Sequence, residues 1–112
     1  MKLVTAIIKP QHVEAVSDAL HDIDIGGITI SEVRGHGRQR GHTEVYRGGE
    51  YTVDFVPKME IKVVTKDSET EKVANTIIDA ARSGKIGDGK VWIQPLEMVV
   101  RIRTGEIGDE AI

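Results

Sequence analysis

Residues 58–84 read KMEIKVVTKDSETEKVANTIIDAARSG, and this stretch contains a strand pattern followed by a helix pattern. Apolar Met59, Ile61 and Val63 alternate with charged residues, which predicts a strand with one buried face. Apolar residues then recur at helical spacing on one face, and these are Val73, Ala74, Ile77, Ile78 and Ala81. The capping-box pattern Ser68-Glu69-Thr70-Glu71 predicts the start of that helix, and Gly84 its end.

The same strand–helix order precedes this stretch, and one more strand follows it. Leu3 to Ile8 is a short apolar run that predicts a buried strand, and Pro10 suits the entrance of the next helix. Alternation from Ile28 to about Gly35 predicts a second strand. A last strand is predicted from Val91 to Ile102, with an edge or a bulge at Pro95. The first helix is predicted from the apolar face of Val13, Val16, Leu20 and Ile23.

The predicted element order is therefore β-α-β-β-α-β. This order is typical of a ferredoxin-like α+β sandwich, in which two helices cover one face of an antiparallel sheet. The second and third strands would form a hairpin, with the segment between them at its tip. Apolar residues near the other sheet face favour burial against further subunits.

Composition limits the class of protein. The 112 residues suit one domain, with an exposed loop at about 37–55, a Gly-Lys turn at about 82–90 and a C-terminal loop at about 102–112. The net charge of −3 does not favour nucleic acid or an anionic membrane as a partner. The absence of cysteine excludes disulfides and cysteine-based zinc sites. The N-terminal apolar run is too short for a signal peptide, and no segment approaches the roughly 20 apolar residues of a membrane helix, so we expect a cytoplasmic protein.

The segment from Gly37 to about Tyr51 matches no regular pattern. It is polar and repeatedly interrupted by glycine. Structureless loops of about 15 residues are uncommon inside compact domains and are usually functional. We therefore expect this loop to carry part of the function.

The most specific local feature is Gly84-Lys85-Ile86-Gly87-Asp88-Gly89-Lys90, which nearly matches the phosphate loop G-x-x-x-x-G-K-[ST]. Val91 stands where that motif needs a hydroxyl, and the turn runs from a helix into a strand instead of the reverse. A P-loop NTPase is therefore excluded. Glycine amides and lysines could still bind an anion, or the glycines could simply serve a helix-to-strand connection.

A second basic feature is Arg101-Ile102-Arg103. In a strand, residues i and i+2 point to one face, so both guanidinium groups could contact one ligand. The pair could also be a solvated strand end. Together with the Gly-Lys turn, it favours an anionic ligand.

Four stretches, in this order and spacing, resemble the PII nitrogen-signalling proteins, and the resemblance runs nearly end to end. They are Gly37-Arg38-Gln39, then residues 41–48 with Glu50-Tyr51, then residues 83–90, and Arg101-Ile102-Arg103-Thr104-Gly105-Glu106. The resemblance implies a homotrimer of ferredoxin-like subunits with ATP or ADP in the clefts between them. It implies that Gly87, Asp88, Gly89 and Lys90 cradle the phosphates while Arg101 and Arg103 reach them from the neighbouring subunit. It also implies nucleotide contacts from Thr29, Gly35, Gly37, Arg38 and Val64.

The resemblance further implies that 2-oxoglutarate binds beside ATP through a magnesium ion. Gln39 would be the metal ligand, Lys58 would pair with the distal carboxylate, and Gly41 and Gly87 would lie close. Magnesium prefers oxygen ligands and is commonly held by few protein groups plus phosphates, which agrees with this assignment.

The exposed loop would control the partner proteins. By the resemblance these are an ammonium transporter, which Arg47 would enter, or an enzyme or regulator of nitrogen metabolism. A nucleotidyltransferase could modify Tyr51 with UMP or AMP. Contact with a membrane is expected only through a transporter, and no nucleic acid is expected.

The chain departs from the family at the charged pair on the third strand, where Glu60 and Lys62 look exchanged, so Lys62 is not assigned to the site. Two other functions were weighed. A slow ATP-hydrolysing or phosphoryl-transfer enzyme would need a base such as Asp88 or His42. An RNA-binding module would need stacking aromatics, which are only 4% of this chain. We therefore expect a sensor and not an enzyme.

Overall fold

The computed structural model describes residues 1–36, 42–46, 49–53 and 55–112, with the backbone alone described in 42–46 and 49–53. Strands β1, β2, β3 and β4 span Lys2–Ile8, Thr29–Gly35, His42–Tyr46 and Gly49–Val53, and β5 and β6 span Val56–Thr65 and Lys90–Pro95. Helices α1 and α2 span Val13–Asp22 and Thr70–Ala81. Short 3₁₀ helices cover Pro10–His12, Asp67–Glu69 and Gly108–Ala111.

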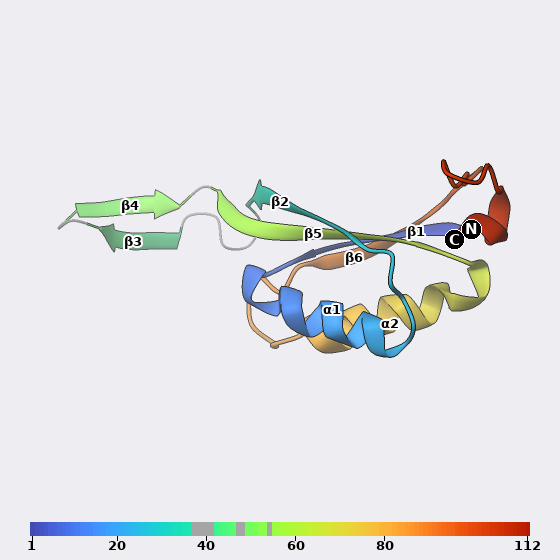
Figure 1. Ribbon diagram of the computed structural model, residues 1–112. Helices are drawn as coiled ribbons and strands as arrows, with labels where there is room; N and C mark the ends of the chain where they lie inside the picture. Colours follow the sequence, from blue (N-terminus) through green and yellow to red (C-terminus); the bar gives the residue numbers. More distant parts are fainter. Residues whose placement is uncertain (37–41, 47–48, 54) are drawn as a thin grey trace.

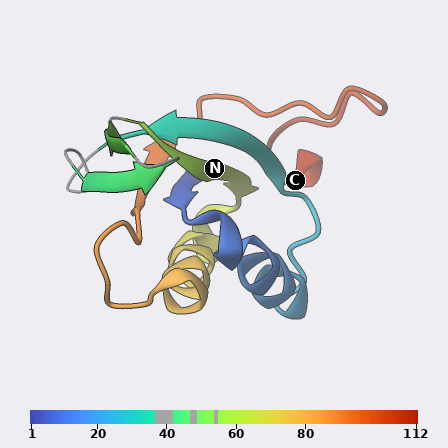
Figure 2. The same ribbon diagram turned by 90° about the vertical axis from the view of Figure 1, so that its left-hand side faces the viewer.

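Four strands form one antiparallel sheet in the order β2-β5-β1-β6. Helices α1 and α2 lie together on one face of this sheet, and neither of them covers the opposite, open face (Figures 1 and 2). The predicted α+β class and the predicted order of the four main strands and two helices are confirmed. The predicted hairpin of the second and third strands is also confirmed, because β2 pairs with β5.

The core lies between the sheet and the helices. Alternation along β1 sends Val4, Ala6 and Ile8 into this core and leaves Ile7 on the open face. Directly paired strand residues share a face, so Lys62 and Trp92, which both pair with Thr5, lie on the open face as well. The predicted helix faces are confirmed by the buried residues Val16, Leu20, Val73, Ala74, Ile77 and Ala81.

The predicted last strand is wrong beyond Pro95. Proline has no backbone N–H to donate, and the Leu96 N–H donates instead to the Met1 carbonyl, 3.1 Å away. The chain then leaves the sheet and forms a loop closed by a single bridge between Val100 and Ile107. Arg101 and Arg103 therefore do not stand on a strand of the sheet.

The predicted capping box is also wrong. The 3₁₀ turn Asp67–Glu69 comes first, and α2 begins at Thr70 without a side-chain cap from Ser68. The Thr70 hydroxyl instead donates to the Lys66 carbonyl and shares a hydrogen bond with the Thr65 hydroxyl.

The loop between β2 and β5 contains regular structure that the sequence patterns did not indicate. Strands β3 and β4 pair antiparallel, from His42 opposite Val53 to Tyr46 opposite Gly49. They form their own two-stranded sheet and extend away from the four-stranded one (Figure 1). The prediction of an irregular segment is therefore wrong for these ten residues.

Candidate functional site

The Gly-Lys turn connects α2 to β6 through backbone conformations that favour glycine. Gly84, Gly87 and Gly89 all have positive φ, at 81°, 94° and 101°. At Gly89 the constraint is also steric, because a Cβ atom there would lie 1.6 Å from the Ile7 carbonyl oxygen. The turn therefore presses against strand β1 at a point where only glycine fits.

The carboxylate of Asp88 holds this turn together. It accepts hydrogen bonds from the Ser83 N–H, the Gly84 N–H and the Ser83 hydroxyl, the first two at 2.9 Å. The Lys9 ammonium lies 3.2 Å from the same carboxylate. The Ser83 hydroxyl, then the backbone N–H groups and Lys9, hold the pKa of Asp88 far below its usual range. Asp88 is thus a charged anchor of the turn, and its carboxylate is already occupied.

Lys58 joins β5 to the same turn. Its ammonium donates a hydrogen bond of 2.6 Å to the carbonyl oxygen of Gly87. Burial is the main cause of the lowered pKa of Lys58, the charge of Lys9 lowers it further, and Asp88 partly offsets both. The two residues predicted to contact the same keto acid are therefore in direct contact.

A cavity of about 660 Å³ opens beside these groups on the open-face side. Among the residues whose side chains the structure describes, three lysines line it, Lys58, Lys85 and Lys90, together with one carboxylate, the anchored one of Asp88. The remaining lining residues are Ile7, Gly35, His36, Ile86, Gly87, Gly89 and Trp92. The structure thus brings together the predicted residues Gly35, Lys58 and Gly87 to Lys90 around one basic cavity.

Four lining residues were not assigned to the site from the sequence, namely Ile7, His36, Ile86 and Trp92, whereas Lys85 was indicated as a charge of the Gly-Lys turn. Ile7 pairs directly with Lys90, so it belongs to the cavity because of strand register. Trp92 lies two residues after Lys90, on the same face of β6. Strand alternation in β6 was the signal that could have found Trp92.

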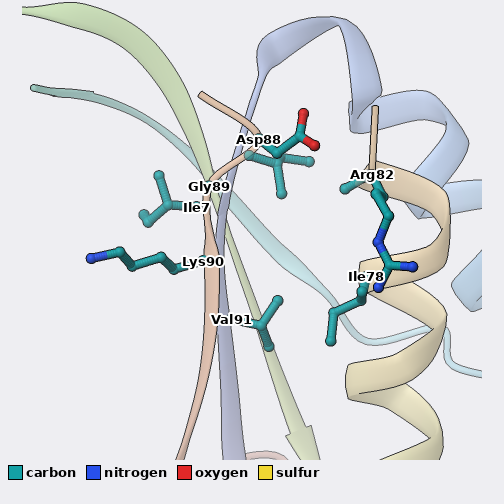
Figure 3. A pocket seen from close by; sticks show the side chains of 9 residues that line it. Ile7, Ile78, Arg82, Asp88, Gly89, Lys90 and Val91 are labelled. Atoms are coloured by element: carbon teal, nitrogen blue, oxygen red, sulfur yellow. The ribbon is translucent and has the colours of Figure 1, made fainter. Parts of the chain in front are cut away.

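A smaller cavity of about 170 Å³ lies on the helix side of the same strand segment. Figure 3 shows Val91 pointing toward α2 in this cavity, while Lys90 points to the opposite side of the strand. Its lining is mainly apolar, from Ile8, Ile78, Ala81 and Val91, with Arg82 and Asp88 beside them. No predicted binding residue belongs to it apart from the shared turn residues Asp88, Gly89 and Lys90.

Four predicted nucleotide contacts do not line the larger cavity of their own chain. Thr29 pairs with Lys62 and Val64 pairs with Leu3, so both lie on the open face but away from the cavity. Arg101 donates a hydrogen bond of 2.9 Å to the Glu106 carboxylate, and Arg103 lies in the exposed turn that follows. The prediction that the two arginines share one strand face is wrong, because β6 has already ended.

Several predicted residues lie outside the described part of the chain. These are Gly37, Arg38, Gln39, Gly41 and Arg47, and Tyr51 is described only as part of the β4 backbone. Within the described ranges, no group of three or more His, Cys, Asp or Glu residues is placed to hold a metal ion.

The exchanged charges on β5 form an ion pair. The Lys62 ammonium lies 3.3 Å from the Glu60 carboxylate, as expected for residues i and i+2 on one strand face. This pair lies outside the cavity lining.

Comparison with known proteins identifies the family. The family model "Nitrogen regulatory protein P-II" matches residues 1–106. The chain belongs to the P-II family. It is 55% identical to the nitrogen regulatory protein P-II of Azospirillum brasilense and 54% identical to that of Microchaete diplosiphon, over the full length of both chains in each case. The protein of the same name from Rhodospirillum rubrum is 51% identical over the same span.

These P-II relatives are named as regulatory proteins, and the resemblance inferred from the four sequence stretches is confirmed. None of the helices in the described part of this P-II protein is long and apolar enough to cross a membrane.

Proposed function

We propose that this P-II protein binds ATP or ADP together with 2-oxoglutarate at the larger cavity, and that the bound ligands control partner proteins through the loop at about 37–55. The observation that carries the proposal is the convergence of Gly35, Lys58 and Gly87 to Lys90 around one basic cavity. Amides of a glycine turn and lysine ammonium groups are suited to phosphates and carboxylates.

The proposal includes a homotrimer of ferredoxin-like subunits. Thr29, Val64, Arg101 and Arg103 lie outside the cavity of their own chain, so they would serve the cavity of a neighbouring copy. Exposed apolar residues support such an assembly, and they include Met98, Val100, Ile102 and Ile107 in the segment after β6. Arg101 would exchange its Glu106 partner for phosphate when a neighbour's nucleotide is bound.

A magnesium ion would join the two ligands. Gln39 would supply one protein oxygen, and Gly41, Lys58 and Gly87 would surround the keto acid. Asp88 is a poor metal ligand here, because its carboxylate already accepts three hydrogen bonds and pairs with Lys9. Most oxygen ligands of the ion would then come from the nucleotide and the keto acid, as is common for magnesium.

The output would be a change in the ordering of the loop that carries Gln39, Arg47 and Tyr51. Ligands change partner affinity only through different affinities for different loop states. The partners would be an ammonium transporter or an enzyme or regulator of nitrogen metabolism in the cytoplasm, and a nucleotidyltransferase could act on Tyr51.

The phosphoryl-transfer alternative is less well supported. It needs a base, and the low pKa of Asp88 together with its occupied carboxylate makes that residue a weak one. We therefore favour ligand sensing without turnover.

Calorimetry tests the proposed function. We expect saturable heat with Mg-ATP, and 2-oxoglutarate binding that requires Mg-ATP. Light scattering after size exclusion should give the mass of three chains. Equal 2-oxoglutarate binding with and without Mg-ATP, or a single chain in solution, would contradict the proposal.

A further inference from the structure

One ionisable residue of the larger cavity has no role in the proposed phosphate and keto-acid contacts. His36 lines this cavity directly after β2 ends at Gly35. Its side chain is exposed, so it can exchange a proton with solvent. Histidine is the side chain that ordinarily changes its charge near neutral pH, whereas lysine and aspartate side chains, which line the same cavity, ordinarily titrate far from neutrality.

An aromatic contact places the imidazole at the cavity. Gly35 pairs with Val56, so His36 and Phe55 are the next residues on the two sides of the β2–β5 ladder. Their ring centroids lie 5.2 Å apart and their planes meet at 65°, which is an edge-to-face contact. An aromatic ring within about 6 Å also attracts a cation, so Phe55 can pack against the imidazole in either charge state.

The charges around His36 are mainly positive. Among the described side chains, the charged groups that line the cavity with it are Lys58 of β5, Lys85 and Asp88 of the turn and Lys90 of β6, and Arg34 stands two residues earlier on β2. The Asp88 carboxylate already binds the turn and Lys9. Within this described lining, a protonated His36 therefore gains a negative partner only when an anion enters the cavity.

We propose that His36 takes up a proton when an anionic ligand binds in the larger cavity, and that ligand affinity therefore rises as the pH falls through neutrality. The carboxylates or phosphates of the ligand supply the negative charge that favours the imidazolium over the neutral ring. By linkage, a ligand that favours proton uptake must bind more tightly to protein that already carries the proton. The inference rests on the proposed function, because it assumes that anions bind in this cavity.

The test uses 2-oxoglutarate, titrated by calorimetry into the full chain with saturating Mg-ATP. Both of its carboxylates stay ionised between pH 6 and pH 8, so its own charge is constant. We expect affinity to be about threefold tighter at pH 6 than at pH 8, within the limit of about tenfold per pH unit for one linked proton. At pH 7, titrations in two buffers of different ionisation heat should show uptake of a fraction of one proton per ligand.

Two variants assign the proton. His36→Phe keeps an aromatic ring beside Phe55 but cannot be protonated, so it should lose the proton uptake and the added affinity at pH 6 while it binds like the parent at pH 8. His21→Gln, at the exposed end of α1, is the matched control and should keep the parent profile. A purely structural role of His36 would instead lower affinity equally at every pH.

Nuclear magnetic resonance gives a second readout on the unmodified protein. The chain has four histidines, and the ring signal that is missing from His36→Phe belongs to His36. This signal should move toward its protonated position when 2-oxoglutarate is added at constant pH.

The two proposals fail in different ways. If the unmodified protein binds neither Mg-ATP nor 2-oxoglutarate, the proposed function fails and the inference fails with it. If it binds both without proton uptake, or if His36→Phe keeps the parent's pH profile, only the inference is overturned. A His36 ring signal that does not respond to the ligand would overturn it as well.

Discussion

The Lys58 ammonium and the Gly87 carbonyl oxygen are joined by a hydrogen bond of 2.6 Å, which ties strand β5 to the Gly-Lys turn. Both residues line the larger cavity. An anion that binds there could accept from the same ammonium, because it has three N–H donors and only one of them is used on Gly87. Binding could thus satisfy the charge of Lys58 while the hydrogen bond to Gly87 holds the ammonium in place.

We expect Lys58→Met to weaken 2-oxoglutarate binding at least about tenfold, because a partly buried cation that pairs with a carboxylate is lost. Nucleotide binding should change much less, since Lys85, Lys90 and the glycine amides remain. Calorimetry with 2-oxoglutarate in the presence of Mg-ATP is the measurement. Lys72→Met, on the exposed side of α2, is the matched control. Equal affinities in the Lys58 and Lys72 variants would contradict the assignment.

The lowered pKa of Lys58 predicts an alkaline pH dependence. Lys58 loses its proton in the folded protein below its ordinary pKa of 10.5, mainly because of burial and then because of Lys9. Affinity for 2-oxoglutarate should therefore fall as the pH rises toward 10.5. The folded state binds fewer protons than the unfolded state in that window, so Lys58 should make stability rise with pH there.

Lys58→Arg separates this effect from other titrations. Arginine stays charged throughout, so the alkaline loss of keto-acid affinity should move to higher pH or disappear. Calorimetric titrations of parent and variant in the same buffers from neutral to alkaline pH would show it. An identical pH profile in both proteins would refute the role of Lys58 charge.

Gly89→Ala should destabilise the protein by about 3 kcal/mol or more, since the new methyl group clashes with backbone and the φ of 101° is strained for alanine. Gly84→Ala is the control, because its φ of 81° carries similar strain but its Cβ would meet open space. It should cost only about 1 kcal/mol. Urea unfolding monitored by circular dichroism measures both. Similar losses in the two variants would argue against the close approach of Gly89 to β1.

Asp88→Asn should lower stability at neutral pH and flatten its dependence on acid. The folded pKa of Asp88 lies well below the ordinary value of 3.8, so its stabilising contribution is present above that value and is lost as the pH falls below it. Urea midpoints from pH 7 to pH 2 should fall more steeply in the parent than in the variant. Asp79→Asn, on the exposed side of α2, should keep the steep profile. A parent-like acid profile in Asp88→Asn would contradict the anchoring role.

Thr5→Val should raise the free energy of unfolding by about 1 kcal/mol, because the buried Thr5 hydroxyl has no hydrogen-bond partner within the described chain. Thr65→Val is the matched control. Its buried hydroxyl bonds to Thr70 at 2.8 Å, so its loss should cost about 1 kcal/mol. Both are measured by urea unfolding. A destabilised Thr5→Val protein would contradict the view that the Thr5 hydroxyl is buried at a net cost.

The fold was largely predictable because its helices and central strands have strong apolar periods. Val16, Leu20, Val73 and Ile77 were assigned to buried faces and are buried. The prediction fails for the last strand, where the local sequence pattern favours a strand but the rest of the sheet offers no partner for it. Val99, Val100 and Ile102 look like strand residues, but the pairing of β6 with β1 reaches only Pro95 opposite Lys2 and the Leu96 N–H on the Met1 carbonyl.

The site was only partly predictable. Glycine and lysine spacing in residues 84–90 indicated an anion-binding turn, but the contact between Lys58 and Gly87 joins residues 29 positions apart, and spacing alone carries no such information. Ile7 and Trp92 enter the cavity through the register of β1 against β6. Register depends on the whole sheet, so Ile7 could not be assigned from its own segment, whereas alternation along β6 could have placed Trp92 beside Lys90.

Alternate residues of strand β1 have two different roles, core packing and cavity lining. Val4, Ala6 and Ile8 pack in the core, and Ile7 lines the larger cavity. Substitutions at the three core positions are limited by the volume of the core and need matching changes in α1 and α2. Substitutions at Ile7 are limited by the molecule that binds in the cavity. A substitution at Ile7 could therefore change ligand preference during evolution at little cost to folding stability. Along β1, positions that tolerate substitution should alternate with positions that do not.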